Sequence, residues 1–314
     1  MTKAIILVGD VLQRLTEVPD KSVRTTITSP PYWGLRDYGE DGQLGAEPTP
    51  QEFVDNLVAV MREVRRTLTD DGTLWLNLGD SYFNAQNSNR NGAGQSALGG
   101  KVRGGGEYKT QKRSAGALPI KHKDLVGIPW RVAFALQADG WYLRQDIVWA
   151  KSNPMPESAT DRCTKSHEYI FLLSKTPTYY FNHKAIREPA TTKNGKPRQF
   201  GASNQVGTMR NDEGRIFEDT GMRNKRDVWS IPTKPYKGAH FAVFPEALIE
   251  PCVLAGSEQG DIVLDPFTGS GTTAVVALRH GRGFIGTELN KEYADIAYNR
   301  ITEGNPIMAE VELR

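Results

Sequence analysis

The sequence predicts an α/β fold in which helices cover both faces of a mostly parallel sheet, built as a single domain of 314 residues. Two observations predict this class. Seven short apolar runs, many of them rich in β-branched residues, alternate with stretches of helical periodicity. Two motifs rich in proline or glycine directly follow such runs, where parallel α/β sheets carry their ligand-binding loops. We therefore expect one doubly wound sheet with a site at one edge.

The seven expected strands are bounded by turn residues. In chain order they are 4–8, 23–27, 73–78, 143–149, 168–173, 262–264 and 283–287. Apolar residues recur at helical spacing over 53–68, and Asp71 and Gly72 are expected to end that helix. Pro129 and Pro245 each precede an apolar, helix-forming stretch, which suits proline at the start of a helix.

Composition excludes several classes of protein. The formal net charge of +2 gives no global sign of a polyanionic partner. Cys163 and Cys252 have no second Cys or His at ligand spacing, and His167-Glu168 has no third ligand, so we expect neither a disulfide framework nor a metal site. The N-terminal apolar run is too short for a signal peptide, and no run approaches the ~20 residues that span a membrane. We expect a soluble protein of a reducing cytoplasm, without a membrane partner.

The motif Ser29-Pro30-Pro31-Tyr32-Trp33 follows the second expected strand. This motif resembles the amino-group pocket of amino-methyltransferases. An exocyclic amine on a nucleobase is a poor nucleophile because its lone pair is delocalised into the ring. The Ser29 side-chain oxygen and the Pro30 carbonyl can accept the two N–H bonds of such an amine and free that lone pair. The two prolines fix the backbone in advance, and Tyr32 offers an aromatic face for a base rotated out of a duplex. Trp33 either extends that face or belongs to the core.

A second motif follows the sixth expected strand and has glycines where side chains would block a ligand. It lacks the Gly-Lys-Ser/Thr ending of a phosphate loop and the glycine spacing of the dinucleotide fingerprint. It resembles the cofactor loop of methyltransferases, and that resemblance makes Asp265, Pro266, Phe267, Gly269, Ser270, Gly271 and Thr272 its candidate cofactor-binding residues. Glu288 closes the seventh expected strand, where a carboxylate can accept hydrogen bonds from both hydroxyls of a ribose.

Together, and in this order along the chain, the two motifs resemble those of the β group of DNA amino-methyltransferases. The resemblance covers most of the chain outside two basic segments. It implies a Rossmann-like seven-stranded sheet in circularly permuted methyltransferase order, the strands filling sheet positions three, four, five, six, seven, one and two. It also implies S-adenosylmethionine as the cofactor, with Asp10 near its adenine and Asp265 near its methionine part. The implied substrate is a base flipped out of double-stranded DNA.

The two basic segments break the strand–helix rhythm. Segment 84–123 holds eight glycines and eight Lys or Arg against one acidic residue, and segment 184–226 holds ten Lys or Arg against five acidic residues. Loops of this length are either solvated insertions or functional ones. Because Lys and Arg suit phosphates, and Asn, Gln and Arg suit base edges, we expect both to contact DNA. We assign 84–123 to the DNA backbone and 184–226 to target recognition.

Several alternatives stay open at this point. Ser29 is typical of the cytosine-N4 enzymes of this group, so N4 of cytosine is favoured over N6 of adenine, whose enzymes more often carry Asp or Asn there. A protein-glutamine or RNA amino-methyltransferase shares the pocket, but the glutamine enzymes carry Asn before Pro-Pro-Tyr and place the cofactor motif first. A DNA-binding protein without catalysis is the remaining alternative. The sequence is compatible with a homodimer, with a cognate restriction endonuclease and with a bacterial, archaeal or phage host.

Overall fold

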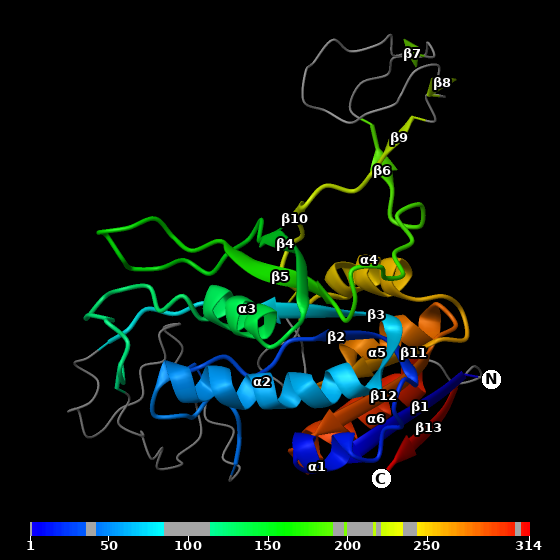
Figure 1. Cartoon of the computed structure of the whole chain (residues 1–314), viewed down its shortest axis with the longest axis horizontal. Helices are drawn as coiled ribbons and strands as arrows, with labels where there is room; N and C mark the ends of the chain where they lie inside the picture. Colours follow the sequence, from blue (N-terminus) through cyan, green and yellow to red (C-terminus); the bar gives the residue numbers. More distant parts are fainter. Residues whose placement is uncertain are drawn as a thin grey trace.

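The computed structural model describes residues 2–35, 42–84, 114–190, 198–199, 216–217, 221–234, 244–304 and 309–314 (Figure 1). One nine-stranded sheet lies at the centre of this part of the chain. In sheet order its strands are β10 (Val228–Ser230), β4 (Tyr142–Ala150), β5 (His167–Ser174), β3 (Leu68–Leu78), β2 (Val23–Thr28), β11 (Ile262–Asp265), β12 (Gly283–Glu288), β1 (Thr2–Val8) and β13 (Ala309–Leu313). Every neighbouring pair is parallel except the two pairs that involve β5.

The seven inner strands coincide with the seven predicted runs. The late strands β11 and β12 lie between the early strands β2 and β1, which is the predicted circular permutation. The prediction of seven strands is wrong at the two edges, where β10 joins β4 and β13 joins β1. These two strands have only three and five residues and therefore carry little apolar signal.

Helices cover both faces of the sheet, as predicted. On one face lie α1 (Val11–Leu15), α2 (Pro50–Thr67) and α3 (Ile128–Ala138), and on the other lie α4 (Glu246–Gly256), α5 (Thr272–Arg279) and α6 (Lys291–Gly304). The alternation within β3 shows the two sides, because Leu74 and Leu76 pack with the first group and Trp75 packs with the second. Cys252 is fully buried in α4, and burial raises the pKa of its thiol. None of the helices in the described ranges is long and apolar enough to cross a membrane.

Helix α2 begins at a complete capping box. The Thr49 hydroxyl accepts the Glu52 backbone N–H, and the Glu52 carboxylate accepts that of Thr49. The prediction that Asp71 and Gly72 end this helix is wrong, because the helix ends at Thr67 and β3 begins at the next residue. Leu68 already pairs with β2, so pairing of the backbone between strands prevails there over the helical pattern of the apolar residues.

The predicted DNA-contacting segment 84–123 is described only at residue 84 and from residue 114 onward, so most of it lies outside the described residues. Segment 184–226 is described in part. Its strands β6 (Glu188–Pro189) and β9 (Met222–Arg223) pair antiparallel, as do β7 (Arg198–Gln199) and β8 (Ile216–Phe217). Figure 1 shows these two pairs one above the other, away from the central sheet. The second segment therefore includes a narrow arm built from paired strands.

Candidate active site

The carboxyl ends of the parallel strands meet at one edge of the sheet and bring together loops from distant parts of the chain. Strand β5 runs antiparallel to its neighbours, so its first residues lie at the same edge. The segments that meet there are 9–10, 29–33, 77–82, 150–153, 167–169, 265–271 and 288–290. Both predicted motifs are among them.

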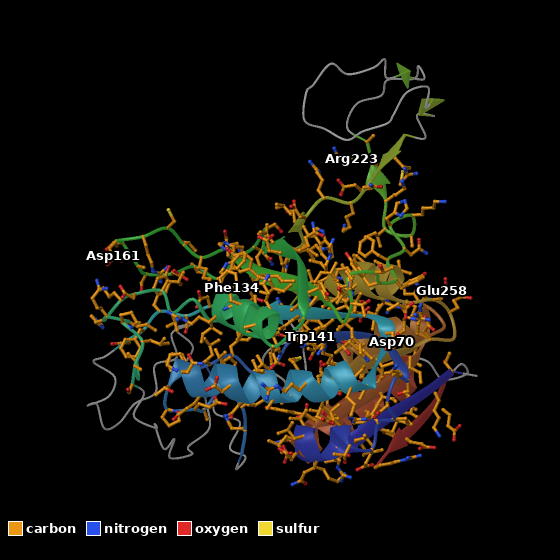
Figure 2. The ribbon with its side chains drawn as sticks, viewed as in Figure 1. Asp70, Phe134, Trp141, Asp161, Arg223 and Glu258 are labelled. Atoms are coloured by element: carbon orange, nitrogen blue, oxygen red, sulfur yellow. The ribbon has the colours of Figure 1, made fainter. Side chains whose placement is uncertain are left out.

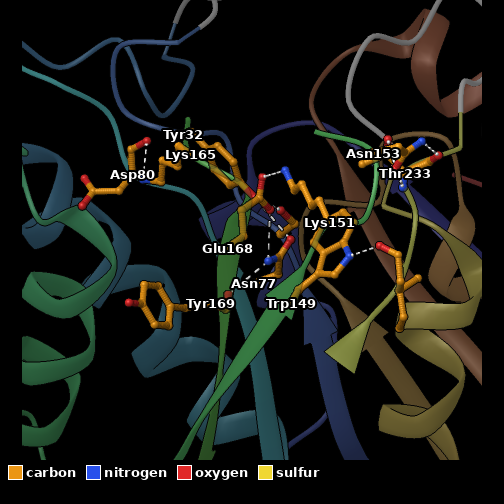
Figure 3. A network of polar contacts seen from close by, with 12 residues as sticks. Tyr32, Asn77, Asp80, Trp149, Lys151, Asn153, Lys165, Glu168, Tyr169 and Thr233 are labelled. Carbon is orange, nitrogen blue, oxygen red and sulfur yellow. Dashed lines mark hydrogen bonds and ion pairs between the residues drawn. The ribbon is translucent and has the colours of Figure 1, made fainter. Parts of the chain in front are cut away.

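The catalytic motif follows β2, and its tyrosine is held at both its hydroxyl and its ring (Figure 3). The Tyr32 hydroxyl lies 2.8 Å from Glu168 Oε2 and 3.2 Å from Asn77 Oδ1, the two acceptors for its proton. Ser29 Oγ donates to the Tyr32 hydroxyl oxygen at 3.4 Å. The tyrosine ring lies directly over Gly79, where an added Cβ would stand 2.5 Å from Tyr32 Cε2. Pro30 is buried, and Pro31 is partly exposed.

A second group of polar side chains extends this network across the sheet edge. Lys151, just beyond β4, forms an ion pair with Glu168 Oε1 at the start of β5. Asn77, near the end of β3, donates to Glu168 Oε2 at 3.3 Å and to the backbone oxygen of Tyr169 at 3.0 Å. The side chains of Lys151 and Glu168 are 21% and 14% exposed. A lysine-paired carboxylate thus lies against the hydroxyl of Tyr32, at the border between protein and solvent.

Three neighbouring residues that the sequence left without a definite role have structural partners. Trp33 is 4% exposed and donates its indole N–H to the backbone oxygen of Glu47, so it belongs to the core. Asp80 caps α3, where its Oδ1 accepts the backbone N–H groups of Gly127 at 3.0 Å and Ile128 at 3.1 Å. His167 packs edge-on against the ring of Tyr169, with 5.3 Å between the ring centroids.

The glycine-rich loop begins with a carboxyl group that is turned into the protein. Asp265 is 1% exposed, and its Oδ1 accepts the Thr28 hydroxyl at 2.6 Å and the Phe267 N–H at 3.1 Å. Its Oδ2 accepts the Thr273 hydroxyl at 2.7 Å. Burial raises the pKa of Asp265 to about 7, and the nearby charge of Glu288 adds to that rise. The carboxyl group therefore joins the ends of β2 and β11 and shapes the loop between β11 and α5.

Other polar side chains of the loop also form hydrogen bonds within the protein. Ser270 and Thr272 are each 3% exposed, and their hydroxyl oxygens accept hydrogen bonds from Arg300 of α6 at 3.0 Å and 2.8 Å. Gly269 and Gly271 have φ angles of +51° and +76°, which side chains rarely adopt. The loop thus has a fixed backbone.

The groups that remain partly exposed around this loop suit a nucleoside. Phe267 offers an aromatic face, and Glu288 lies beside the turn, where Oε2 accepts the Gly269 N–H at 2.8 Å. The Gly9 N–H donates to the backbone oxygen of Glu288 at 2.9 Å, which places Asp10 next to that acid. Asp10 also caps α1 through the Gln13 N–H. A ribose diol needs a carboxylate acceptor and an adenine needs an apolar face, so these residues fit the predicted cofactor.

Sequence reasoning missed the residues whose role depends on distant partners. Thr28 and Thr273 hold the Asp265 carboxyl, and Arg300 holds the cofactor loop from a helix that follows it in sequence. The sequence pattern indicates for Glu168 only an incomplete metal-ligand pair with His167, and it indicates no role for Lys151. Their positions could have indicated a role, because Lys151 lies just after the expected strand 143–149 and Glu168 begins the expected strand 168–173. Within the described residues, no group of three or more His, Cys, Asp or Glu side chains is arranged to hold a metal ion.

Comparison with known proteins places this site in a family. Residues 23–299 match the family model N6_N4_Mtase, described as DNA methylase. Type II methyltransferase M.Cfr9I of Citrobacter freundii is 46% identical over 303 residues, covering 95% of this chain and 87% of the relative. Type II methyltransferase M.SmaI of Serratia marcescens is 46% identical over 301 residues, covering 94% and 90%.

Solved structures agree with this placement. TTHA0409 of Thermus thermophilus, crystallised with S-adenosyl-L-methionine, matches with a TM-score of 0.60 and 25% identity over 98% of this chain and 99% of that one. The PvuII DNA methyltransferase, titled cytosine-N4-specific, shares the fold with a TM-score of 0.63 and 18% identity over 99% and 95%. The predicted cofactor is the one bound in TTHA0409. The predicted family is confirmed, and the chain belongs to the N6/N4 DNA methylases.

Proposed function

We propose that this chain methylates an exocyclic amino nitrogen of a base flipped out of double-stranded DNA, with S-adenosylmethionine as the methyl donor and N4 of cytosine as the favoured target. The hydrogen bond between Thr28 and Asp265, 2.6 Å long, carries the proposal. Thr28 directly precedes the catalytic motif, and Asp265 opens the cofactor loop. One contact therefore sets the amine pocket and the cofactor loop side by side, as direct methyl transfer requires.

Each residue has a defined task in this proposal. Glu288 would hold the ribose hydroxyls, Asp10 and Phe267 would lie around the adenine, and the backbone of the loop that begins at Asp265 and Pro266 would hold the methionine part. When bound, the cofactor supplies an electrophilic methyl carbon on a sulfonium. The candidate catalytic residues Ser29, Pro30, Pro31 and Tyr32 act on the other reactant: two acceptors orient the amine, and the tyrosine ring stacks on the base.

The choice of cytosine rests on the residue that opens the catalytic motif. Ser29 is shorter than the Asp or Asn that is more usual in adenine-N6 enzymes, and its hydroxyl lies next to a tyrosine that is fixed by Glu168 and Asn77. N6 of adenine is the second candidate. Mass spectrometry of nucleosides from DNA treated with the protein separates the two products. We expect N4-methylcytosine, and N6-methyladenine in its place would reverse the assignment.

The same incubation tests the broader proposal. Double-stranded DNA, RNA and a glutamine-containing peptide are each mixed with the protein and S-adenosylmethionine carrying a labelled methyl group. We expect label in DNA alone, and much slower labelling when Ser29 is replaced by alanine. Label in RNA or peptide would favour the corresponding amino-methyltransferase, and DNA binding without label would favour a non-catalytic protein.

Target recognition is assigned to segment 184–226. Its described part places Glu188 between Arg223 and Arg226, with hydrogen bonds of 2.9 Å and 2.8 Å, which holds two guanidinium groups at one end of the arm. Arginine is the most frequent reader of guanine edges in the major groove. Exchanging 184–226 for the matching segment of a relative with another target should move the methylated site. An unchanged site after the exchange would overturn the role of the arm.

The Type II relatives also support a cognate restriction endonuclease as a partner.

A further inference from the structure

We propose that Glu168 is the terminal acceptor for the proton that the target amine loses on methylation, and that the proton reaches it through Ser29 and Tyr32. The inference rests on the proposed function, because it concerns how that same site completes methyl transfer. Glu168 has no catalytic role in the assignment made above, which ends at the four residues of the catalytic motif.

Geometry is the first support. Ser29 Oγ donates to the Tyr32 hydroxyl at 3.4 Å, and the Tyr32 hydroxyl lies 2.8 Å from Glu168 Oε2 (Figure 3). The two hydroxyls therefore form a chain of hydrogen bonds that begins at Ser29 and ends at one carboxylate. Catalytic hydrogen bonds of this kind are often long without substrate and shorten when it binds, which suits the longer first contact.

The surroundings of the carboxylate are the second support. Lys151 pairs with Oε1, and Asn77 donates to Oε2, the oxygen that also faces Tyr32. The carboxylate thus ends the hydrogen-bonded chain from Ser29, with one oxygen facing Tyr32 and the other paired with Lys151. The partial exposure of Lys151 and Glu168 gives the proton a way out to water after each turnover.

The step balances in atoms and charge. The amine lone pair forms the nitrogen–methyl bond as the methyl–sulfur bond breaks with its electron pair going to sulfur, which leaves a positive charge on nitrogen. An N–H proton then passes to Ser29 Oγ as the serine proton passes to Tyr32 and the tyrosine proton passes to Glu168. The products are the neutral methylated amine, unchanged Ser29 and Tyr32, and a protonated Glu168 that loses its proton to water.

Relay and simple positioning predict different results for one conservative change. Glu168→Gln keeps the size and the hydrogen-bonding reach of the side chain, so it still holds Tyr32 if positioning is the whole role. The same change removes proton acceptance. Tyr32→Phe keeps the stacking ring and removes the middle of the relay. Glu312→Gln is the matched control, because Glu312 pairs with Lys3 at 2.5 Å on strands β13 and β1, away from this network.

The experiment measures single-turnover methylation of duplex DNA by the full-length protein, with cofactor and DNA affinities measured alongside. We expect Glu168→Gln and Tyr32→Phe each to slow the step by about 10- to 100-fold at unchanged affinities, and the double variant to be no slower than the slower single one.

The outcomes separate the two levels of inference. Wild-type methylation with an equally fast Glu168→Gln variant overturns the relay and leaves the proposed function standing. A wild type that methylates no DNA overturns both.

Discussion

The two loops at the sheet edge use their polar side chains in opposite ways. In the cofactor loop, Asp265, Ser270 and Thr272 are 1% to 3% exposed, and each is hydrogen-bonded within the protein. Around the catalytic loop, Glu168 and Lys151 are partly exposed and form an ion pair, and Glu168 also accepts the Tyr32 hydroxyl (Figure 2 shows the side chains around the sheet, and Figure 3 this network).

The difference separates two kinds of work. A cofactor bound by backbone N–H groups needs a loop that is already rigid, so buried side chains serve the loop itself. An amine that must be oriented and then lose a proton needs polar and ionisable groups that reach the pocket. We therefore expect substitutions in the first loop to act on binding or stability, and substitutions in the second to act on the rate.

Replacing Ser29 by alanine should have the largest effect. Its hydroxyl is proposed to act on the amine in the transition state, so we expect the single-turnover rate to fall by about 100- to 1,000-fold while cofactor and DNA affinities stay unchanged. Ser22→Ala is the control, because Ser22 immediately precedes β2, at the strand's other end. A rate within a few-fold of wild type in Ser29→Ala would place the chemistry elsewhere.

Glu288 should dominate cofactor affinity. A hydrogen bond to a carboxylate contributes about 1.5–3 kcal/mol, so Glu288→Ala should weaken S-adenosylmethionine binding by roughly 10- to 100-fold in calorimetry. Asp265→Asn keeps the shape of the buried group and should weaken binding far less. Equal losses in the two variants would show that Asp265 contacts the cofactor, as the resemblance alone implied, and would remove the contrast between the two carboxyl groups.

The ring of Tyr32 depends on a glycine beneath it. An added Cβ at Gly79 would stand 2.5 Å from the ring, so Gly79→Ala must displace Tyr32 from its place between Ser29 and Glu168. We expect the rate of methylation to fall by about tenfold, with little change in cofactor affinity. Gly283→Ala is the matched control, since its new Cβ would meet only ordinary contacts at 3.5 Å or more. Equal rates in the two variants would show that the ring position is unimportant.

The sequence predicted the fold because apolar strands alternate with helical stretches over most of the chain. It missed β10 and β13, which are short edge strands. It located both loops because motifs at strand ends are visible in sequence, but it could not tell side-chain contacts from backbone contacts. That distinction depends on partners such as Thr28, 237 residues from Asp265, and Arg300 on α6.

The role of Glu168 could not be predicted from the sequence either, because its partners come from other strands. Its neighbour Lys151 lies 17 residues earlier in the chain, and Asn77 lies 91 residues earlier. Only the antiparallel course of β5 brings the start of that strand to the edge where the parallel strands end. If every strand is assumed to end at the same edge, the two motif loops are placed correctly. The first residues of the antiparallel strand β5, among them Glu168, are then placed at the wrong edge.

The smallest effect on activity, and a distinct effect on stability, is expected from Asp265→Asn. Burial raises the pKa of Asp265 to about 7 in the folded protein, above the ordinary value of about 4 in the unfolded chain. The folded state thus binds the proton more tightly than the unfolded state does. The stabilisation from that proton is fully present below about pH 4 and is lost as the pH rises through about 7.

Asparagine has no such ionisation, and it can still accept a hydrogen bond from Thr28 or Phe267. The difference in unfolding free energy, wild type minus Asp265→Asn, should therefore decrease by more than about 1 kcal/mol between pH 5 and pH 8. Urea unfolding at several pH values measures it, and other titrating groups cancel because both proteins contain them. A difference that does not change with pH would mean that Asp265 stays ionised throughout. The cofactor loop would then contain a buried charged carboxylate, as the catalytic network contains the charged pair of Lys151 and Glu168. The two loops would differ only in how exposed their polar side chains are.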